Sequence, residues 1–148
     1  MPNYKTVFFT LGMLQIILGI FMIIPIIIQY VYGEFDSSFI IASIITLIFG
    51  ILFVISNLDY DKKINLHQAF LLTSLSWITI AIFGALPLFF SKLNLSFTDA
   101  FFESMSGITT TGSTIIINLE NAPKSILLWR ALLQWLGGIG IIVMAITL

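Results

Sequence analysis

Four long apolar stretches constrain the fold of this chain more than any other feature. The first runs from Val7 to Tyr32 without a charged residue, and others follow at about 39–55, 68–90 and 125–148. Each meets or exceeds the length of about 17–25 residues with which helices cross a bilayer. We expect Pro25 to kink the first stretch. Because hydrocarbon offers backbone groups no partner, the pattern predicts an all-α membrane protein.

The composition excludes several classes of function. Of the 148 residues, 59% are hydrophobic and 9% are charged, whereas soluble domains carry about 25% charged residues. A net charge of −1 argues against nucleic acid as a partner. The absence of cysteine excludes disulfides and thiolate sites, and the single His67 excludes a histidine metal cluster within the chain. With no nucleophile or cofactor motif, we expect neither an enzyme nor a cofactor.

Polar segments divide the chain into parts. An N-terminal pair of transmembrane helices is predicted at 1–58, a charged aqueous loop at 59–67, and a third part at 68–148. If the first two spans are real, three lysines fall on the same side of the membrane: Lys5, Lys62 and Lys63. The positive-inside rule makes that side, and with it the N-terminus, cytoplasmic.

The segment Ser96–Ser113, SFTDAFFESMSGITTTGS, lies between the third and fourth apolar stretches. It is too short and too polar to cross a bilayer. Ser96 and Asp99 match the start signal of a helix, which we expect at about 97–107. The Gly- and Thr-rich run at 108–113 follows it. A short helix and an extended run at membrane depth predict a re-entrant loop, which survives only buried in protein or lining a watery path.

This extended run has the chemistry of an ion filter. A dehydrated cation needs oxygen ligands, and channels supply them as rings of backbone carbonyls. Glycine permits the backbone angles that such a strand requires, and the preceding helix directs its negative end toward the cation. We therefore assign ion binding to Thr109, Thr110, Thr111, Gly112 and Ser113. The alternative interpretation is an ordinary hydroxyl-rich surface loop.

Two separated motifs extend this interpretation. Residues 98–113, TDAFFESMSGITTTGS, resemble the first pore loop of the Trk/Ktr/HKT superfamily, and of TrkH-type subunits in particular. Residues 127–144, LLWRALLQWLGGIGIIVM, resemble the helix that follows this loop, and FGALPLFFS at 83–91 resembles the end of the helix before it. The resemblance implies two N-terminal transmembrane helices followed by one helix–pore-loop–helix unit of the potassium-channel type.

The resemblance also implies a function. Such proteins take up potassium across the bacterial inner membrane and fold four pore-loop units around one pore. Residues 110–113 would stand in the place of the Thr-Val-Gly-Tyr of ordinary potassium channels, and the carbonyls of Thr110 and Thr111 would ligate K⁺. In plant HKT relatives, serine in place of the filter glycine is associated with sodium preference, so Gly112 implies potassium permeation.

The implied partners come from the same resemblance. In this family the channel subunit works as a homodimer with a cytoplasmic nucleotide-binding regulatory subunit. We interpret the apolar end at Leu148 as truncation after the first of four units. Two alternatives stay open. One is a small homotetrameric cation channel, and the other is a non-transporting membrane scaffold module.

Three charged residues are predicted to support the pore. Arg130 lies within the fourth apolar stretch, where ionisable residues normally find a partner. Glu103 is the favoured partner, and Asp99, four residues earlier on the same helix face, is the other. Such a pair would fix the pore helix against the following helix. Alternatively, Arg130 extends its charge to the headgroups.

Three glycines mark the fourth apolar stretch: Gly137, Gly138 and Gly140. Small residues in membrane helices usually allow close packing. A flexing point is the other interpretation. Packing is favoured here.

Overall fold

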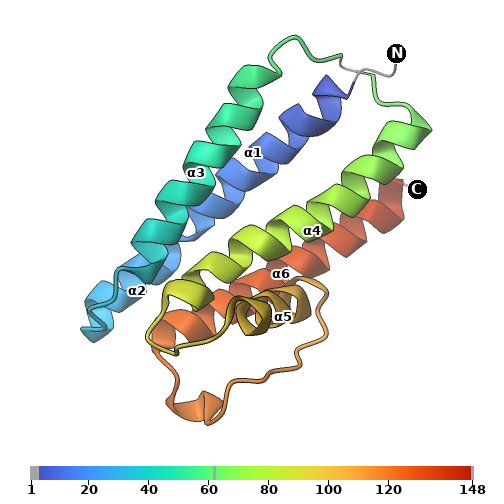
Figure 1. The fold of residues 1–148 in the computed structure, drawn as a ribbon. Helices are drawn as coiled ribbons and strands as arrows, with labels where there is room; N and C mark the ends of the chain where they lie inside the picture. The colour runs from blue at the N-terminus through green and yellow to red at the C-terminus, as the bar shows by residue number, and fades with distance from the viewer. Residues whose placement is uncertain (1–3, 62, 148) are drawn as a thin grey trace.

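The computed structural model describes residues 4–61 and 63–147, and within these ranges it contains helices and no strand. Figure 1 shows a helix pair standing beside two further long helices, with a short helix at one end. The elements are α1 (Lys5–Phe21), α2 (Ile23–Tyr32), α3 (Ser38–Ser56), α4 (Leu66–Phe90), α5 (Phe97–Ile108), the 3₁₀ turn η1 (Leu119–Asn121) and α6 (Lys124–Thr147).

Four helical stretches of the described residues are long and apolar enough to cross a membrane. They are Lys5–Tyr32, Ser38–Ser56, Leu66–Phe90 and Lys124–Val143. Their starts lie within about two residues of the starts predicted from the apolar pattern. The start of α1 and the end of α6 lie at the end of the molecule opposite α5 (Figure 1). The predicted all-α membrane fold is confirmed.

Pro25 explains an interruption in the first spanning stretch. Helix α1 ends at Phe21 and α2 begins at Ile23, with Met22 between them. Proline has no N–H to donate to the Phe21 carbonyl four residues earlier, and its ring crowds that carbonyl. Met22 keeps helical backbone angles, with φ −65° and ψ −16°. The helix interruption expected from Pro25 is therefore present at Met22, about one turn before the proline.

The N-terminal pair is held together by close contact of α1 with α3. A Cβ atom added at Gly12 would lie 2.8 Å from the carbonyl oxygen of Gly50, and one at Gly19 would lie 2.8 Å from the side chain of Leu47. Small residues let membrane helices approach in this way. The Ser43 hydroxyl donates to the Gly19 carbonyl at 2.9 Å. The two helices consequently form one closely packed pair.

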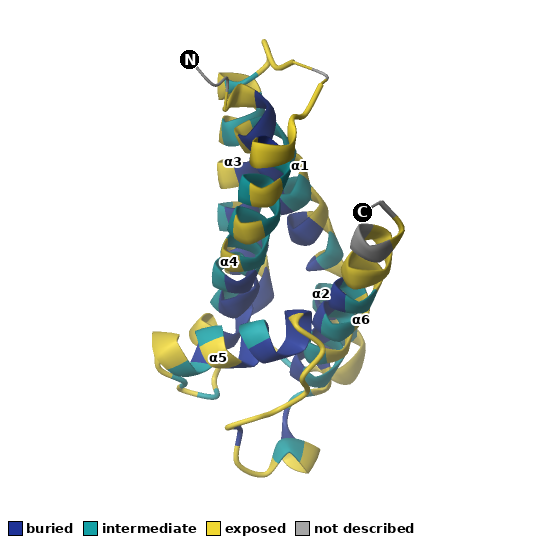
Figure 2. Cartoon of the chain, turned by 90° about the vertical axis from the view of Figure 1, so that its right-hand side faces the viewer, coloured by how far each residue is buried: buried dark blue, intermediate teal, exposed yellow. Residues whose placement is uncertain are grey.

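A buried tryptophan connects this pair to the remaining helices. Trp129 of α6 is fully buried, and its indole N–H donates to the Gly84 carbonyl of α4 at 2.9 Å. Its ring lies edge-on to Phe39 of α3, with centroids 5.8 Å apart. The residue therefore packs in the core. Figure 2 shows buried residues where α5 meets α4 and α6 and also along α1, whereas the segment after α5 is mostly exposed.

The loop between α3 and α4 folds back on the start of α1. The Thr6 hydroxyl donates to the Asp61 carbonyl at 2.9 Å. The rings of Phe9 and Tyr60 stack with centroids 4.0 Å apart. Lys62, one of the lysines on which the predicted orientation depends, lies outside the described residues.

Candidate functional site

The site begins with the short helix α5. The hydroxyl of Ser96 accepts the backbone N–H of Asp99 at 3.1 Å, which starts the helix as its sequence predicts. The acidic side chain of Asp99 is in the first turn, near the positive end of the helix dipole. The helix ends at Ile108, one residue beyond the predicted end. Its negative C-terminal end therefore adjoins the Thr-Gly segment.

The backbone of the Thr-Gly segment turns back onto the end of α5. Four consecutive N–H groups donate to carbonyls of the last turn: Thr109 to Met105 at 2.9 Å, Thr110 to Gly107 at 2.9 Å, Thr111 to Ser106 at 3.0 Å, and Gly112 to Ser106 at 3.2 Å. Thr110 and Gly112 have positive φ values of 60° and 77°. Only glycine adopts such angles without steric cost, which explains the glycine at residue 112.

These N–H bonds fix the direction of the carbonyls. In a trans peptide, the C=O of one residue points opposite to the N–H of the next. Because the N–H groups of residues 110, 111 and 112 point toward α5, the carbonyls of Thr109, Thr110 and Thr111 point away from it. The segment is exposed from Thr109 to Ser113. A row of carbonyl oxygens thus faces outward from the protein on this side.

Unlike these carbonyl groups, the hydroxyl groups of Thr109 and Thr111 contact each other or α5. The Thr109 hydroxyl donates to the Met105 carbonyl at 2.7 Å and lies 3.0 Å from the Thr111 hydroxyl. At the other end, the Ser106 hydroxyl donates to the Ser113 carbonyl at 2.7 Å. Of the residues predicted to bind the ion, Ser113 therefore turns its carbonyl toward α5, unlike Thr110 and Thr111.

Glu103 anchors the chain that leaves this segment. Its carboxylate is buried with the residue only 1% exposed. One oxygen accepts the Thr114 hydroxyl and the Ile115 N–H, both at 2.6 Å. The other oxygen accepts the Nε–H of Arg130 from α6 at 2.8 Å. A single carboxylate of α5 therefore connects α6 with the segment that follows Ser113.

This contact decides between the interpretations of Arg130. Its side chain is 12% exposed and paired with Glu103, so its charge is directed into the protein. The predicted pairing is present. Asp99 lies one turn earlier on α5, and its contact in the structure is the cap at Ser96.

Close packing explains the first glycine of α6. A Cβ at Gly137 would lie 1.8 Å from the Ile108 carbonyl oxygen, so only glycine lets α6 approach the end of α5. At Gly138 the nearest neighbour of an added Cβ is a Thr110 methyl at 4.0 Å. At Gly140 no described atom outside the surrounding turns of α6 itself lies within 4 Å. The packing interpretation therefore applies to Gly137.

The sequence did not reveal three of these contacts. Ser106, Thr114 and Ile115 were not among the predicted site residues, although they orient both ends of the Thr-Gly segment. A serine in the last turn of a helix that precedes a glycine-rich run is a weak signal. The Ile115 contact uses a backbone N–H and has no side-chain signal at all.

The family model TrkH, described as a cation transport protein, matches residues 35–148. The chain belongs to the TrkH family of cation transport proteins. The sequence resemblance to TrkH-type subunits is thereby confirmed.

Relatives in the TrkH family have similar sequences over nearly the whole chain. The Trk system potassium uptake protein TrkI of Halomonas elongata is 44% identical over 139 residues, which are 93% of this chain and 28% of that protein. The Trk system potassium uptake protein TrkH of Escherichia coli K12 is 36% identical over 152 residues, covering 99% of this chain and 31% of that one. An archaeal relative, the uncharacterized cation transporter MJ1485 of Methanocaldococcus jannaschii, is 42% identical over 135 residues, covering 90% and 28%.

A solved structure agrees with the fold. The crystal structure of the potassium transporter TrkH from Vibrio parahaemolyticus superposes with a TM-score of 0.93 at 33% identity. The match covers 99% of this chain and 32% of that chain. The present chain therefore spans less than a third of the length of these TrkH-family proteins. Within that length its helices are arranged as they are in the Vibrio structure.

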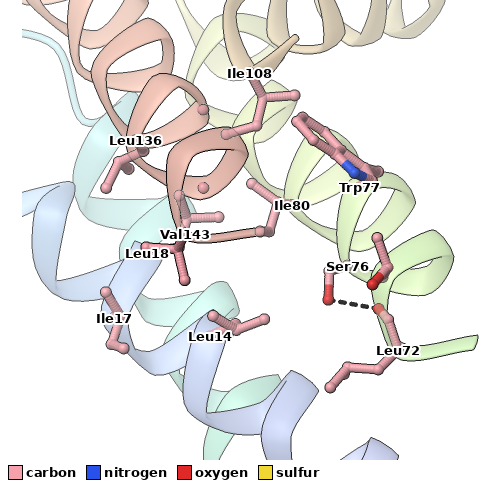
Figure 3. A pocket seen from close by; sticks show the side chains of 13 residues that line it. Leu14, Ile17, Leu18, Leu72, Ser76, Trp77, Ile80, Ile108, Leu136 and Val143 are labelled. Carbon is pink, nitrogen blue, oxygen red and sulfur yellow. Dashed lines mark hydrogen bonds between the residues drawn. The ribbon is translucent and has the colours of Figure 1, made fainter. Parts of the chain in front are cut away.

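A cavity of about 350 Å³ lies beside the end of α5, between α1, α4 and α6. Figure 3 shows aliphatic side chains and Trp77 pointing into it. The Ser76 hydroxyl donates to the Leu72 carbonyl of its own helix at 2.6 Å. Most of the other side chains that line the cavity are apolar, so the cavity is poorly suited to a cation. In the described part of this TrkH-family chain, no group of three His, Cys, Asp or Glu residues could hold a metal ion. The exposed carbonyl oxygens of the Thr-Gly segment are therefore the candidate ligands for a cation.

Proposed function

We propose that this chain contributes one pore-loop unit to a potassium uptake protein. In this unit α4 is the outer helix, α5 the pore helix and α6 the inner helix. The filter strand is residues 109–113, which follow Ile108, the last residue of α5. The family description supports cation transport. The Halomonas and Escherichia relatives are potassium uptake proteins by name and the Vibrio structure is that of a potassium transporter, which supports potassium as the cation.

The direction of the carbonyls carries the proposal. The N–H groups of Thr111 and Gly112 both donate to Ser106, so the carbonyls of Thr110 and Thr111 are presented outward. Carbonyl dipoles on a fixed backbone replace the hydration shell of K⁺ without any acid–base or redox chemistry. The pore helix aims its partial negative charge at the same place, which favours a cation.

Gly112 gives the filter strand its shape. Its φ of 77° lies in the left-handed region, and a Cβ there would lie 3.3 Å from the Gln134 amide nitrogen. A serine at this position would strain the strand by about 1–2 kcal/mol and shift the neighbouring carbonyls. We therefore propose that glycine at position 112 keeps the neighbouring carbonyls in the positions that favour potassium.

The family resemblance supplies the remaining parts of the proposal. The protein would lie in the bacterial inner membrane with its N-terminus in the cytoplasm, and it would work as a homodimer with a cytoplasmic nucleotide-binding regulatory subunit. Cysteine labelling tests the orientation. Glu120→Cys should react with a membrane-impermeant maleimide in intact cells and Lys63→Cys only after permeabilisation, whereas the reverse pattern would contradict this orientation.

Rubidium uptake tests the function directly. The protein expressed from its complete gene should support growth of potassium-requiring cells and take up Rb⁺, and Na⁺ should compete poorly. Gly112→Ser should weaken the preference for Rb⁺ over Na⁺ by about tenfold, as a loss of roughly 1.4 kcal/mol implies. Normal membrane insertion without any uptake would favour the scaffold alternative. Unchanged selectivity in Gly112→Ser would contradict the filter assignment.

A further inference from the structure

Glu34 reaches from the N-terminal helix pair to the first turn of α6. It lies in the short turn between α2 and α3, next to Gly33, and its side chain is partly buried. One carboxylate oxygen accepts the Lys124 N–H. The other accepts the Ser125 N–H at 3.1 Å and the Ser125 hydroxyl at 2.6 Å. The two ends of this contact are 91 residues apart in the sequence.

The contact supplies a cap that α6 lacks locally. The first four N–H groups of a helix have no partner within the helix. The residues before α6, Ala122 and Pro123, have no side-chain acceptor, and its first turn contains no acidic residue. Glu34 fills both roles, because it accepts two of the unpaired N–H groups and places a negative charge at the positive end of the dipole.

Two further contacts hold the same region. Phe39, near the start of α3, packs edge-on against Trp129 in the second turn of α6. The ammonium group of Lys92, in the loop between α4 and α5, donates to the Phe35 carbonyl at 2.8 Å. The turn between α2 and α3 therefore holds both the inner helix and the entrance to the pore helix.

A continuous set of contacts leads from Glu34 to the filter strand. Helix α6 passes from its capped first turn to Arg130 in the second turn, and Arg130 binds Glu103. Glu103 in turn holds Thr114 and Ile115, which directly follow the strand. The filter strand is thus anchored to α5 at both ends, and Glu103 also connects its exit to α6 through Arg130.

From this arrangement we infer that Glu34 is a positioning residue for ion selectivity. It fixes the N-terminal end of α6, and α6 fixes the exit of the filter strand through Arg130 and Glu103. The inference rests on the proposed function. It gives the N-terminal helix pair, which contributes no residue to the filter, a part in setting the carbonyl positions.

Rb⁺ uptake by the protein expressed from its complete gene tests this inference. Glu34→Gln keeps the size of the side chain and removes its charge and one acceptor. It should raise the KM for Rb⁺ and weaken discrimination against Na⁺ by about three- to tenfold per molecule in the membrane, the range expected for loss of a helix cap. Ser125→Ala should have a smaller effect of the same kind and should add nothing in the Glu34→Gln background, because both act through one contact.

Glu120→Gln is the matched control. Glu120 is an exposed carboxylate of η1, between the filter strand and α6. Its loss removes the same charge from this end of the molecule without removing a cap. It should leave KM and selectivity within about twofold of the unmutated protein, since surface charges contribute little.

The outcomes separate this inference from the proposed function. An unmutated protein that reaches the membrane and carries no Rb⁺ refutes the proposed function. If the unmutated protein transports and Glu34→Gln has unchanged KM and selectivity, only the role of Glu34 is refuted. Failure of Glu34→Gln to reach the membrane would assign the carboxylate to folding alone and would also overturn the inference, as would an equal effect of Glu120→Gln.

Discussion

At the scale of single residues, Glu103 is where the contacts of the candidate site converge. A buried carboxylate costs several kcal/mol unless its charge is paired and its oxygens are hydrogen-bonded. Here three donors meet it, from Arg130, Thr114 and Ile115. Each donor belongs to a segment that must be in place before the carboxylate is satisfied. The residue therefore couples the pore helix, the inner helix and the filter exit.

Arg130→Ala should lower membrane abundance and Rb⁺ uptake together. It leaves the Glu103 carboxylate without its charged partner, and breaking a buried pair in this way costs about 3–5 kcal/mol. Immunoblotting of membranes alongside uptake measures both effects. Lys63→Ala, which removes an exposed cation from the loop before α4, is the control. Normal abundance with normal uptake in Arg130→Ala would show that the pair is unimportant.

Glu34 should make stability depend on pH in the acid range. Burial raises the pKa of this carboxyl, but hydrogen bonds from Ser125 and Lys124 outweigh it and hold the pKa below its ordinary 4.5. A lowered pKa stabilises the folded protein at pH values above 4.5, and this contribution is lost as pH falls through the folded-state pKa. The Tm difference between the unmutated protein and Glu34→Gln should therefore be largest near neutral pH and vanish in acid. A difference that does not change with pH would contradict the cap.

At the scale of elements, the seat of α5 on α6 depends on one glycine. Gly137→Ala places a methyl group against the Ile108 carbonyl at a distance no packing allows, so α6 must move away from the filter. Overpacking of this kind costs about 1–3 kcal/mol. Lower thermal stability in detergent and lower uptake are expected. Gly140→Ala, with no described atom within 4 Å, should leave both unchanged. Equal effects of the two substitutions would contradict the close-packing account.

Much of the arrangement of elements could be predicted from local sequence. Continuous apolar stretches located the spanning helices, because a helix in hydrocarbon must be apolar over its whole length. The cap at Ser96 and Asp99 located α5, since N-capping depends on neighbouring residues. The pairing of Arg130 with Glu103 could be predicted because an intramembrane cation needs a nearby anion.

Contacts between distant or unremarkable residues could not be predicted. Glu34 sits in a turn where acidic residues are common, and its partners at the start of α6 are mainly backbone N–H groups. The Ser106 bond to the Ser113 carbonyl depends on how the strand turns at Gly112, which the sequence permits without specifying. Such contacts arise from the three-dimensional path of the chain and leave no periodic pattern.

At the scale of the whole molecule, the proposed filter strand lies on an exposed side of the described chain. Relatives in the family are more than three times as long as the part of them that this chain matches. A ring of carbonyls needs several strands around one axis. A strand whose carbonyls point outward, as those of Thr110 and Thr111 do, is shaped to contribute to such a ring.

Rb⁺ located in a structure of the complete protein tests the central claim most directly. Anomalous scattering from crystals grown in Rb⁺ should show density within coordination distance of the backbone carbonyl oxygens of Thr110 and Thr111. This density should weaken or move in Gly112→Ser. A protein that transports Rb⁺ but shows its density away from these two carbonyls would contradict the account.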